Sequence, residues 1–382
     1  MILVVNCGSS SVKYRLVDLA DPTTGGGGLV ERIGEPGGDA ADHDEALRHV
    51  AGDVDRAGRE LTAVGHRVVH GGTRFTAPTV IDDDVLAAIR DLSSLAPLHN
   101  PANLVGIERA QAWYPGVPHV AVFDTAFHAT LPPPAATYAL DADLAARLGI
   151  RRYGFHGTSH RFVAYRTAAL LGRPVTEVNT IVLHLGNGAS ATAVAGGRSV
   201  ETSMGLSPLE GLVMGTRPGD IDPAIALHLH REGKLGFDDI DAVLNHRGGL
   251  LGLCGESDMR AVLARRDAGD TAATLAIDVY CHRIRKYIGA YHAVLGRLDA
   301  IAFTAGVGER SAAIRGQALA GLAPLGISVD PARNGAPATG PRVISADGSP
   351  VAVCVVPTDE ELAIAEETAA LISARRPGPA PA

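Results

Sequence analysis

Two distant segments of the chain share one pattern: an apolar strand, a turn of glycine and small polar residues, and a second strand with alternating apolar positions. They read "ILVVNCGSSSVKYRLVD" from residue 2 and "TIVLHLGNGASATAVAG" from residue 180. The pattern predicts two β-hairpins. Turns of this composition are common, so each is either a plain polar turn or a turn whose amides hold a phosphate. If each hairpin heads one α/β half, the chain is a duplicated domain with a cleft between the halves.

The size and composition of the chain limit its fold and its partners. Its 382 residues are enough for two domains, and strand-like segments alternate with helical ones, which indicates an α/β protein. The formal net charge of −8, without a basic block, argues against a nucleic-acid partner. The four cysteines lie far apart with no CxxC pair, which is typical of a reducing compartment. With no signal-peptide features and no apolar run long enough for a bilayer, we expect a cytoplasmic protein that does not contact membranes.

Polar residues that could carry chemistry follow several short apolar strands. The sequence has no GxxxxGK[ST], no complete GxGxxG and no GxSxG, so the common nucleotide and hydrolase motifs give no guidance. "GHRVVHGG" contains Arg67, and "HVAVFDTAFH" places Asp124 at the carboxyl end of a strand, where ligands of α/β sheets bind. Asp124 could equally be a turn cap.

Two histidines stand just before predicted helices. His99 precedes a helix that we expect Asn100 to cap, and His156 precedes a helix that we expect Thr158 or Ser159 to cap. Taken singly, each histidine could be a structural residue at a helix start or a partly buried, hydrogen-bonded side chain.

Arg217 and Glu360 lack a purely structural explanation, and the turn at Gly306 resembles a nucleotide-binding turn only as weakly as a lone GxG does. Arg217 precedes a helix started by Asp222 and Pro223, where an arginine opposes the helix dipole unless an anion is bound. The turn at Gly306 joins a strand to a helix, and Glu360 is a spare carboxylate at a helix start that could reach Mg²⁺. Together these residues suit phosphoryl transfer, which depends on positioning and charge neutralisation.

Nine motifs in order along residues 1 to about 365 resemble the acetokinase (acetate kinase) family. They are "NCGSSSVKY", "GHRVVHGG", "LHNP", "VFDTAFH", "YGFHGTSH", "HLGNGAS", "SMGLSPLEGLVMGTRPGDIDP", "FTAGVGER" and "PTDEEL". The resemblance implies the duplicated two-domain α/β fold of actin, Hsp70 and sugar kinases, with a central cleft. It also implies a homodimer and the Mg²⁺-dependent reaction of ATP with acetate to give ADP and acetyl phosphate, a phosphotransferase reaction with a carboxyl acceptor. Mn²⁺ is expected to substitute for Mg²⁺.

The same resemblance implies roles for individual residues. Asn6 and Glu360 match the metal site, and Arg67, Asp124, His156 and Arg217 match the catalytic groups. Arg67 and His99 match substrate contacts, and the acetate methyl is expected against Val69, Leu98, Phe155 and Pro208. The expected nucleotide site comprises Lys13, Leu183, His184, Leu185, Gly186, Asn187, Gly188, Asp258, Met259, Arg260, Gly306, Val307, Gly308, Glu309 and Arg310.

Two positions depart from the family pattern. Arg310 stands where the family usually has asparagine, which bears on nucleotide preference, and Asp359 stands where asparagine is common. Neither change removes a residue assigned to the chemistry.

Three other functions are less consistent with the sequence. A propionate or butyrate kinase on the same fold would need a wider pocket, against which Phe155 and Pro208 argue. A non-catalytic nucleotide switch of the actin or Hsp70 type would have no use for Arg67 and Arg217. A metal hydrolase is disfavoured because no HExxH or similar ligand set appears. We expect one domain at residues 1–126 plus 362–382, and a nucleotide-binding domain at residues 127–361.

Overall fold

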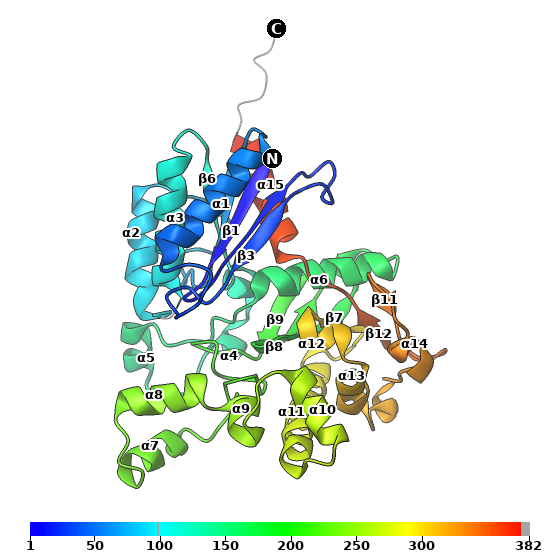
Figure 1. The fold of residues 1–382 in the computed structure, drawn as a ribbon. Coiled ribbons are helices and arrows are strands. Elements are labelled where there is room, and N and C mark those ends of the chain that lie inside the picture. Colours follow the sequence, from blue (N-terminus) through cyan, green and yellow to red (C-terminus); the bar gives the residue numbers. More distant parts are fainter. Residues whose placement is uncertain (98, 376–382) are drawn as a thin grey trace. The chain divides into compact units, whose positions relative to one another are not determined.

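The computed structural model describes residues 1–97 and 99–375 of the chain (Figure 1). The chain divides into two compact units. The first contains Met1–Ala129, Gly157–Ser159 and the segment from Asp359 onward; the second contains Thr130–His156 and His160–Thr358. The domain boundaries expected from the sequence, after residues 126 and 361, stay a prediction.

The first unit is built on a six-stranded mixed sheet with the strand order β3-β2-β1-β4-β6-β5. β1 pairs antiparallel with β2 to form the first predicted hairpin, and β4 runs parallel to both β1 and β6. The strands are β1 (Ile2–Cys7), β2 (Val12–Val17), β3 (Gly27–Val30), β4 (Ala63–Val68), β5 (Thr79–Val80) and β6 (His119–Phe123). Its helices are α1 (His43–Ala57), α2 (Asp83–Asp91), η1 (Leu92–Ser94), α3 (Asn100–Trp113) and α15 (Glu360–Arg375).

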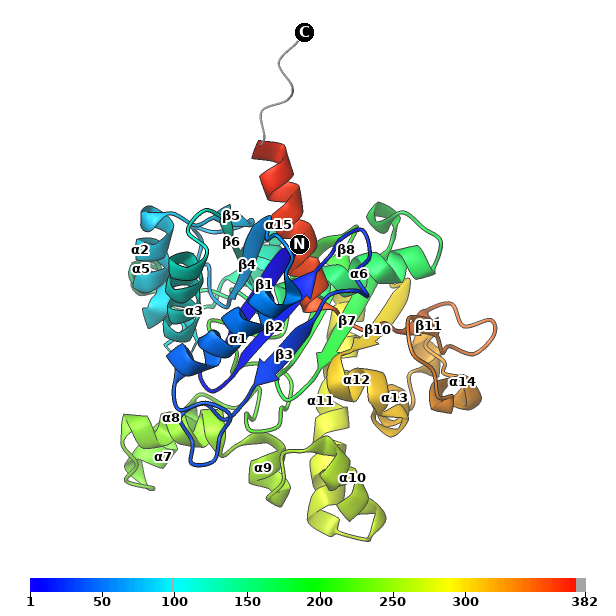
Figure 2. The same cartoon turned by 45° about the horizontal axis from the view of Figure 1, so that its top comes forward.

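Helices cover both faces of this first sheet. Val5 and Cys7 of β1 share one buried core with residues of α1 and α3. On the other face α15 lies so close to β4 that a Cβ on Gly65 would be 2.8 Å from the side chain of Ile364, which explains the glycine there. Figure 2 shows α1 and α15 on opposite sides of the strands.

The second unit contains another six-stranded sheet, of order β11-β12-β10-β7-β8-β9. Its strands are β7 (Asn179–Leu185), β8 (Ala189–Ala195), β9 (Arg198–Thr202), β10 (Ala300–Thr304), β11 (Arg342–Val343) and β12 (Ala352–Val355). Its helices are α4 (Pro133–Ala136), α5 (Ala142–Leu148), η3 (Val175–Glu177), α7 (Ala224–Arg231), α8 (Phe237–His246), α9 (Gly249–Cys254), α10 (Met259–Asp267), α11 (Thr271–Leu295), α12 (Ala305–Arg310), α13 (Ala312–Leu319), η4 (Ala323–Leu325) and α14 (Pro331–Gly335). The first three residues of α6 (Gly157–Leu170) belong to the first unit and the rest of this helix to the second. The short helix η2 (Ala126–Thr130) spans the crossing from the first unit to the second.

The two sheets repeat the same topology. In each, a hairpin and a third antiparallel strand are followed by two parallel strands and a final antiparallel one, so that β7 corresponds to β1 and β10 to β4. The duplicated α/β fold predicted from the two hairpin segments is therefore confirmed. Within the described residues, no helix combines the length and the apolar character needed to cross a membrane.

Two predicted helix caps are wrong. α3 begins at Asn100 itself, whose buried side chain is used elsewhere, and His99 occupies the N-cap position without a side-chain cap bond. α6 begins at Gly157, so Thr158 and Ser159 lie inside the helix; His156 is its N-cap residue, in the left-handed region at φ 57°. For Asn100 the cause is a long-range contact, because its side chain is bonded to the backbone of His70.

Candidate active site

Four of the predicted site residues meet around one guanidinium in the first unit. Side chains alternate between the faces of a strand, and residues on either side of Asn6 and Arg67 in β1 and β4 point into the core under α1, α2 and α3. Asn6, Arg67 and Asp124, which follows β6, therefore face the opposite side, where α15 starts at Glu360. The strands thus place Asn6, Arg67 and Asp124 on one face, and the start of α15 adds Glu360.

Arg67 is held mainly by Asp124. Its Nε and Nη2 atoms donate to the two carboxylate oxygens of Asp124 at 2.9 and 2.6 Å, a bidentate pair in which Asp124 is only 1% exposed. Nη1 donates to Oδ1 of Asn6 at 3.3 Å, and Nε lies 3.7 Å from the Glu360 carboxylate. Burial opposes the charge on Arg67, but Asp124 and Glu360 outweigh it and raise the pKa of the guanidinium.

Glu360 has an unusual environment for a carboxylate. Burial raises the pKa of its carboxyl above the ordinary range; Arg67 opposes this shift, while Asp124 and Glu361 add to it. Lys13, expected in a phosphate-facing hairpin, lies 2.6 Å from Glu361 and is half exposed. A cation placed near Glu360 would relieve the cost of its buried charge.

Two asparagines, Asn100, which the sequence pattern misassigned as a helix cap, and Asn103, which no sequence signal marked, fix the strand end beside this cluster. Asn103 accepts from the Val69 N–H and donates to the Cys7 carbonyl, and Asn100 both accepts from and donates to the backbone of His70. They tie the segment after β4 to α3. Leu98, expected beside the substrate methyl, lies outside the described residues.

In the second unit, Arg217 and His156 flank the turn between β7 and β8. A Cβ placed on Gly188 would lie 3.0 Å from Nη2 of Arg217 and 3.6 Å from the ring of His156. Arg217 Nη1 donates to the carbonyl of Pro208 at 2.5 Å, which fixes the side chain from behind. Burial lowers the pKa of Arg217. Two nitrogen-bearing side chains therefore converge on the backbone of a glycine turn, an arrangement suited to an anion.

His156 belongs to a larger cluster of imidazoles. Its Nδ1 lies 2.9 Å from the Ser190 hydroxyl, which is also 2.6 Å from Nε2 of His160. The ring of His156 stacks on that of His184 with a centroid distance of 4.3 Å. Phe155, expected against the substrate methyl, is fully buried next to this cluster in the chain.

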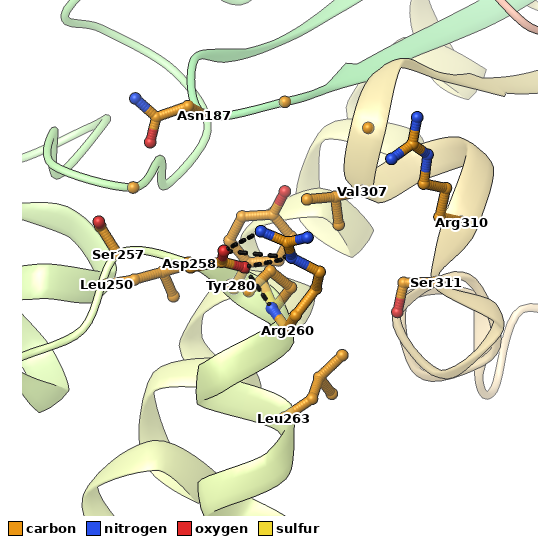
Figure 3. Close-up of a pocket in the computed structure, with 14 residues that line it drawn as sticks. Asn187, Leu250, Ser257, Asp258, Arg260, Leu263, Tyr280, Val307, Arg310 and Ser311 are labelled. Carbon is orange, nitrogen blue, oxygen red and sulfur yellow. Dashed lines mark hydrogen bonds and ion pairs between the residues drawn. The ribbon is translucent and has the colours of Figure 1, made fainter. Parts of the chain in front are cut away.

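A cavity of about 600 Å³ in the second unit gathers most of the predicted nucleotide residues (Figure 3). Its lining includes Gly186, Asn187, Asp258, Met259, Arg260, Gly306, Val307 and Arg310. The sequence analysis missed Gly215, Leu250, Ser257, Leu263, Tyr280 and Ser311, which complete the lining. The Asp258 carboxylate accepts from the side chain and backbone of Arg260, and these bonds lower the pKa of Asp258 to about 2.

Other predicted nucleotide residues lie behind this cavity instead of lining it. Leu183 and Leu185 are fully buried in β7, and Gly308 is buried in α12. The carboxylate of Glu309 accepts from the Ala305 N–H at 2.8 Å. Since Ala305 has φ 63°, this bond stabilises a backbone turn that a non-glycine residue rarely adopts.

Comparison with known proteins decides the family. The model of the acetokinase family matches residues 1–366. The chain belongs to the acetokinase family. The acetate kinase of Streptomyces griseus is 57% identical to it, with 98% of this chain and 97% of that protein covered, and that of Leifsonia xyli is 55% identical, with 98% and 99% covered. The resemblance seen in the motifs is therefore confirmed, and so is the assignment as an enzyme.

Solved structures agree with this membership of the acetokinase family. The crystal structure of Porphyromonas gingivalis acetate kinase superimposes with a TM-score of 0.90 at 39% identity, covering 97% of this chain and 99% of that one. A propionate kinase from Francisella tularensis superimposes equally well, with a TM-score of 0.90 at 40% identity and the same coverage. The overall fold thus does not distinguish the two acids.

Proposed function

We propose that this acetokinase-family protein catalyses the reversible, Mg²⁺-dependent transfer of the γ-phosphoryl group of ATP to acetate, giving ADP and acetyl phosphate. The observation that carries the proposal is the buried Arg67–Asp124 pair. It presents an oriented guanidinium, which is the group best suited to bind a carboxylate. The identity of 55–57% to acetate kinases over nearly the whole chain supports the same activity.

Arg67 is proposed to hold the acetate carboxylate, with Asp124 as its positioning residue. Both oxygens of Asp124 are used by Nε and Nη2, so the plane of the guanidinium is fixed before substrate binds. Acetate is already ionised at neutral pH, so its oxygen needs orientation and no strong base. In this proposal Asp124 acts on the substrate through Arg67.

Arg217 and His156 are proposed to act on the transferred phosphoryl group. In an in-line transfer, an acetate oxygen forms a bond to the γ-phosphorus while the bond from that phosphorus to the β,γ-bridging oxygen breaks, and ADP leaves. Arg217 Nη2 and the His156 ring both point at the Gly188 turn, where they can donate hydrogen bonds to the equatorial oxygens.

Asn6 and Glu360 fit the metal that this reaction requires. Their oxygens contact the same guanidinium, so they converge on one place, and amide and carboxylate oxygens suit Mg²⁺. Within the part of the chain that the structure describes, no cluster of three or more His, Cys, Asp or Glu is arranged for a metal. Two protein ligands are sufficient, because Mg²⁺ in kinases is held largely by phosphates and water. When bound, Mg²⁺ neutralises charge on the phosphate oxygens.

Hydroxamate formation tests the proposal. Enzyme, ATP, Mg²⁺ and hydroxylamine are incubated with acetate, propionate or butyrate, and Arg217→Ala is compared with Arg297→Ala, an exposed arginine of the same unit. We expect turnover to favour acetate and to fall by about 10³-fold in Arg217→Ala, with Arg297→Ala active. Turnover with none of the three acids would refute the proposed function.

Propionate is the second candidate acceptor, and the propionate kinase of similar structure is the observation that favours it. One methylene group is worth about 1–3 kcal/mol in a hydrophobic pocket, so we expect propionate to react more slowly without being excluded. A higher kcat/KM for propionate than for acetate would make propionate the preferred acceptor and leave the proposed mechanism unchanged.

We also propose a homodimer located in the cytoplasm, as the family resemblance implies. Exposed apolar side chains on α7 and α8, above all Phe237 and Leu227, offer surface for a second copy. Light scattering should give twice the chain mass of 39.4 kDa. A mass equal to one chain at micromolar concentration would contradict the dimer.

A further inference from the structure

Tyr280 of α11 has a hydroxyl without a partner at the wall of the nucleotide cavity. Its side chain is 1% exposed, and no described residue offers its hydroxyl a hydrogen bond. Tyr280 nevertheless lines the cavity, and Figure 3 shows its ring among Asp258, Arg260 and Val307, with the hydroxyl directed toward Val307. The sequence carries no signal for this residue, because it occupies an ordinary core position of a long helix.

A buried hydroxyl without a partner destabilises the protein unless a ligand supplies the missing hydrogen bond. A buried polar group without a hydrogen bond lowers the stability of the fold, because the loss of its hydration is not compensated. Burial also raises the pKa of Tyr280, so the phenol keeps its proton and can always donate. The Tyr280 hydroxyl is therefore a neutral donor and acceptor on a residue that lines the cavity.

The surroundings favour a base over a phosphate as the partner. Leu250, Met259, Leu263 and Val307 give the cavity apolar walls that suit a flat aromatic ring. Its Asp258–Arg260 pair is already neutralised internally. Arg217 and His156, the groups suited to phosphates, are not among the residues that line it.

We propose that the Tyr280 hydroxyl hydrogen-bonds to the edge of the purine base of the bound nucleotide and makes Tyr280 a base-recognition residue. This inference rests on the proposed function, since it takes ATP and ADP as the ligands. The bond either donates to a purine ring nitrogen or accepts from the 6-amino group. It acts on nucleotide affinity and leaves acetate binding untouched.

Calorimetric titration of ADP tests the inference with a matched pair of variants. Tyr291 lies on the same helix, is 3% exposed and also has an unpartnered hydroxyl within the described residues, yet it does not line the cavity. We expect Tyr280→Phe to weaken the Kd for ADP by about 3- to 10-fold, the value of one neutral hydrogen bond. Tyr291→Phe should bind ADP like the wild type, and both variants should melt no lower than it.

A second ligand locates the bond. Purine riboside diphosphate lacks the 6-amino group; if Tyr280 accepts from that group, wild type prefers ADP and Tyr280→Phe loses the preference. If Tyr280 donates to a ring nitrogen, both ligands weaken equally in Tyr280→Phe, which also supports the inference. Unchanged ADP affinity in a folded Tyr280→Phe would overturn it. Failure of the wild type to bind ADP would instead refute the proposed function.

Discussion

The hydroxyl of Ser190 lies between two imidazole nitrogens, Nδ1 of His156 and Nε2 of His160. A hydroxyl has one proton, so it can donate to only one of them, and the other nitrogen must donate to the oxygen. If His160 donates and His156 accepts, a neutral His156 keeps its proton on Nε2. That nitrogen is 3.6 Å from the Cβ position of Gly188, so it can donate to an anion at the turn.

Replacing Ser190 by alanine should therefore lower kcat. The variant leaves the tautomer of His156 unspecified, and we expect a loss of roughly 10-fold, the value of about 1.4 kcal/mol. KM for acetate should stay unchanged, because Ser190 bonds to the two imidazoles, whereas acetate is proposed to bind Arg67. Steady-state kinetics of Ser190→Ala measure both constants.

The control is Ser203→Ala, another buried serine of the second unit, whose hydroxyl accepts from the Ala191 N–H. It tests whether loss of any buried serine hydroxyl lowers kcat. Equal losses in the two variants would contradict a specific role for Ser190.

At the scale of elements, the close contacts of the turn between β7 and β8 predict the effect of adding one methyl group at Gly188. Gly188 has no positive φ, so alanine is compatible with its backbone, but its Cβ would lie 3.0 Å from Nη2 of Arg217. The arginine must shift by a few tenths of an ångström. We expect Gly188→Ala to lose roughly 10-fold or more in kcat, because small misplacements of catalytic groups are costly.

The melting temperature of Gly188→Ala should change little, since the far end of a flexible side chain gives way. Gly289→Ala in α11 is the control: nothing lies within 4 Å of its Cβ position, and its φ is not positive. That variant should keep full activity. Full activity in Gly188→Ala would show that Arg217 has no fixed place at this turn.

The first turn of α10 predicts a dependence on pH. The Asp258 carboxylate accepts from the Arg260 side chain and, as the helix cap, from the Arg260 N–H; these bonds, the side-chain bond above all, lower its pKa from 3.8 to about 2. A lowered pKa adds stability that is complete above pH 3.8 and is lost as the pH falls toward 2. Asp258→Ala should cost about 1 kcal/mol near neutral pH, as for other N-caps, and less in acid.

Thermal unfolding of Asp258→Ala and wild type at several pH values between about 3 and 7 measures this difference. Asp238→Ala serves as control, because Asp238 lies in the first turn of α8, whose capping bonds are made by Asp239. A difference that stays constant down to the acid end would contradict the assigned cause.

The secondary-structure elements also explain which site residues could be predicted from the sequence and which could not. Strand ends drew attention to Arg67 and Asp124 from the residues alone, while Asn6 came only from the family resemblance; the roles of all three stay predictions. Asn100 was misassigned because its partner, the backbone of His70, comes from a segment 30 residues earlier. Tyr280 was missed because a buried tyrosine in a long helix looks the same whether its hydroxyl meets a core or a cavity.

For the whole molecule, the duplication is clearer in the topology of the two sheets than in the similarity of the two halves of the sequence. The two sheets repeat one strand order and one pattern of parallel and antiparallel pairs. The sequences share only the hairpin pattern, because a buried strand requires apolar residues at alternating or continuous positions and not particular side chains. Each unit keeps its own polar groups at the ends of its strands: the arginine proposed for acetate belongs to the first unit, and the cavity proposed for the base is lined by residues of the second.

The four cysteines provide a test of that two-unit organisation. All are buried and unpaired, and burial raises the pKa of Cys7, Cys281 and Cys354 to about 12, so the native thiols should resist alkylation. Cys7 belongs to the first unit and Cys254, Cys281 and Cys354 to the second. If each unit unfolds cooperatively, pulse alkylation across a urea gradient should give partly unfolded species carrying one label or three. Mass spectrometry counts the labels directly, and an abundant species with two would mean that the second unit does not unfold as one cooperative body.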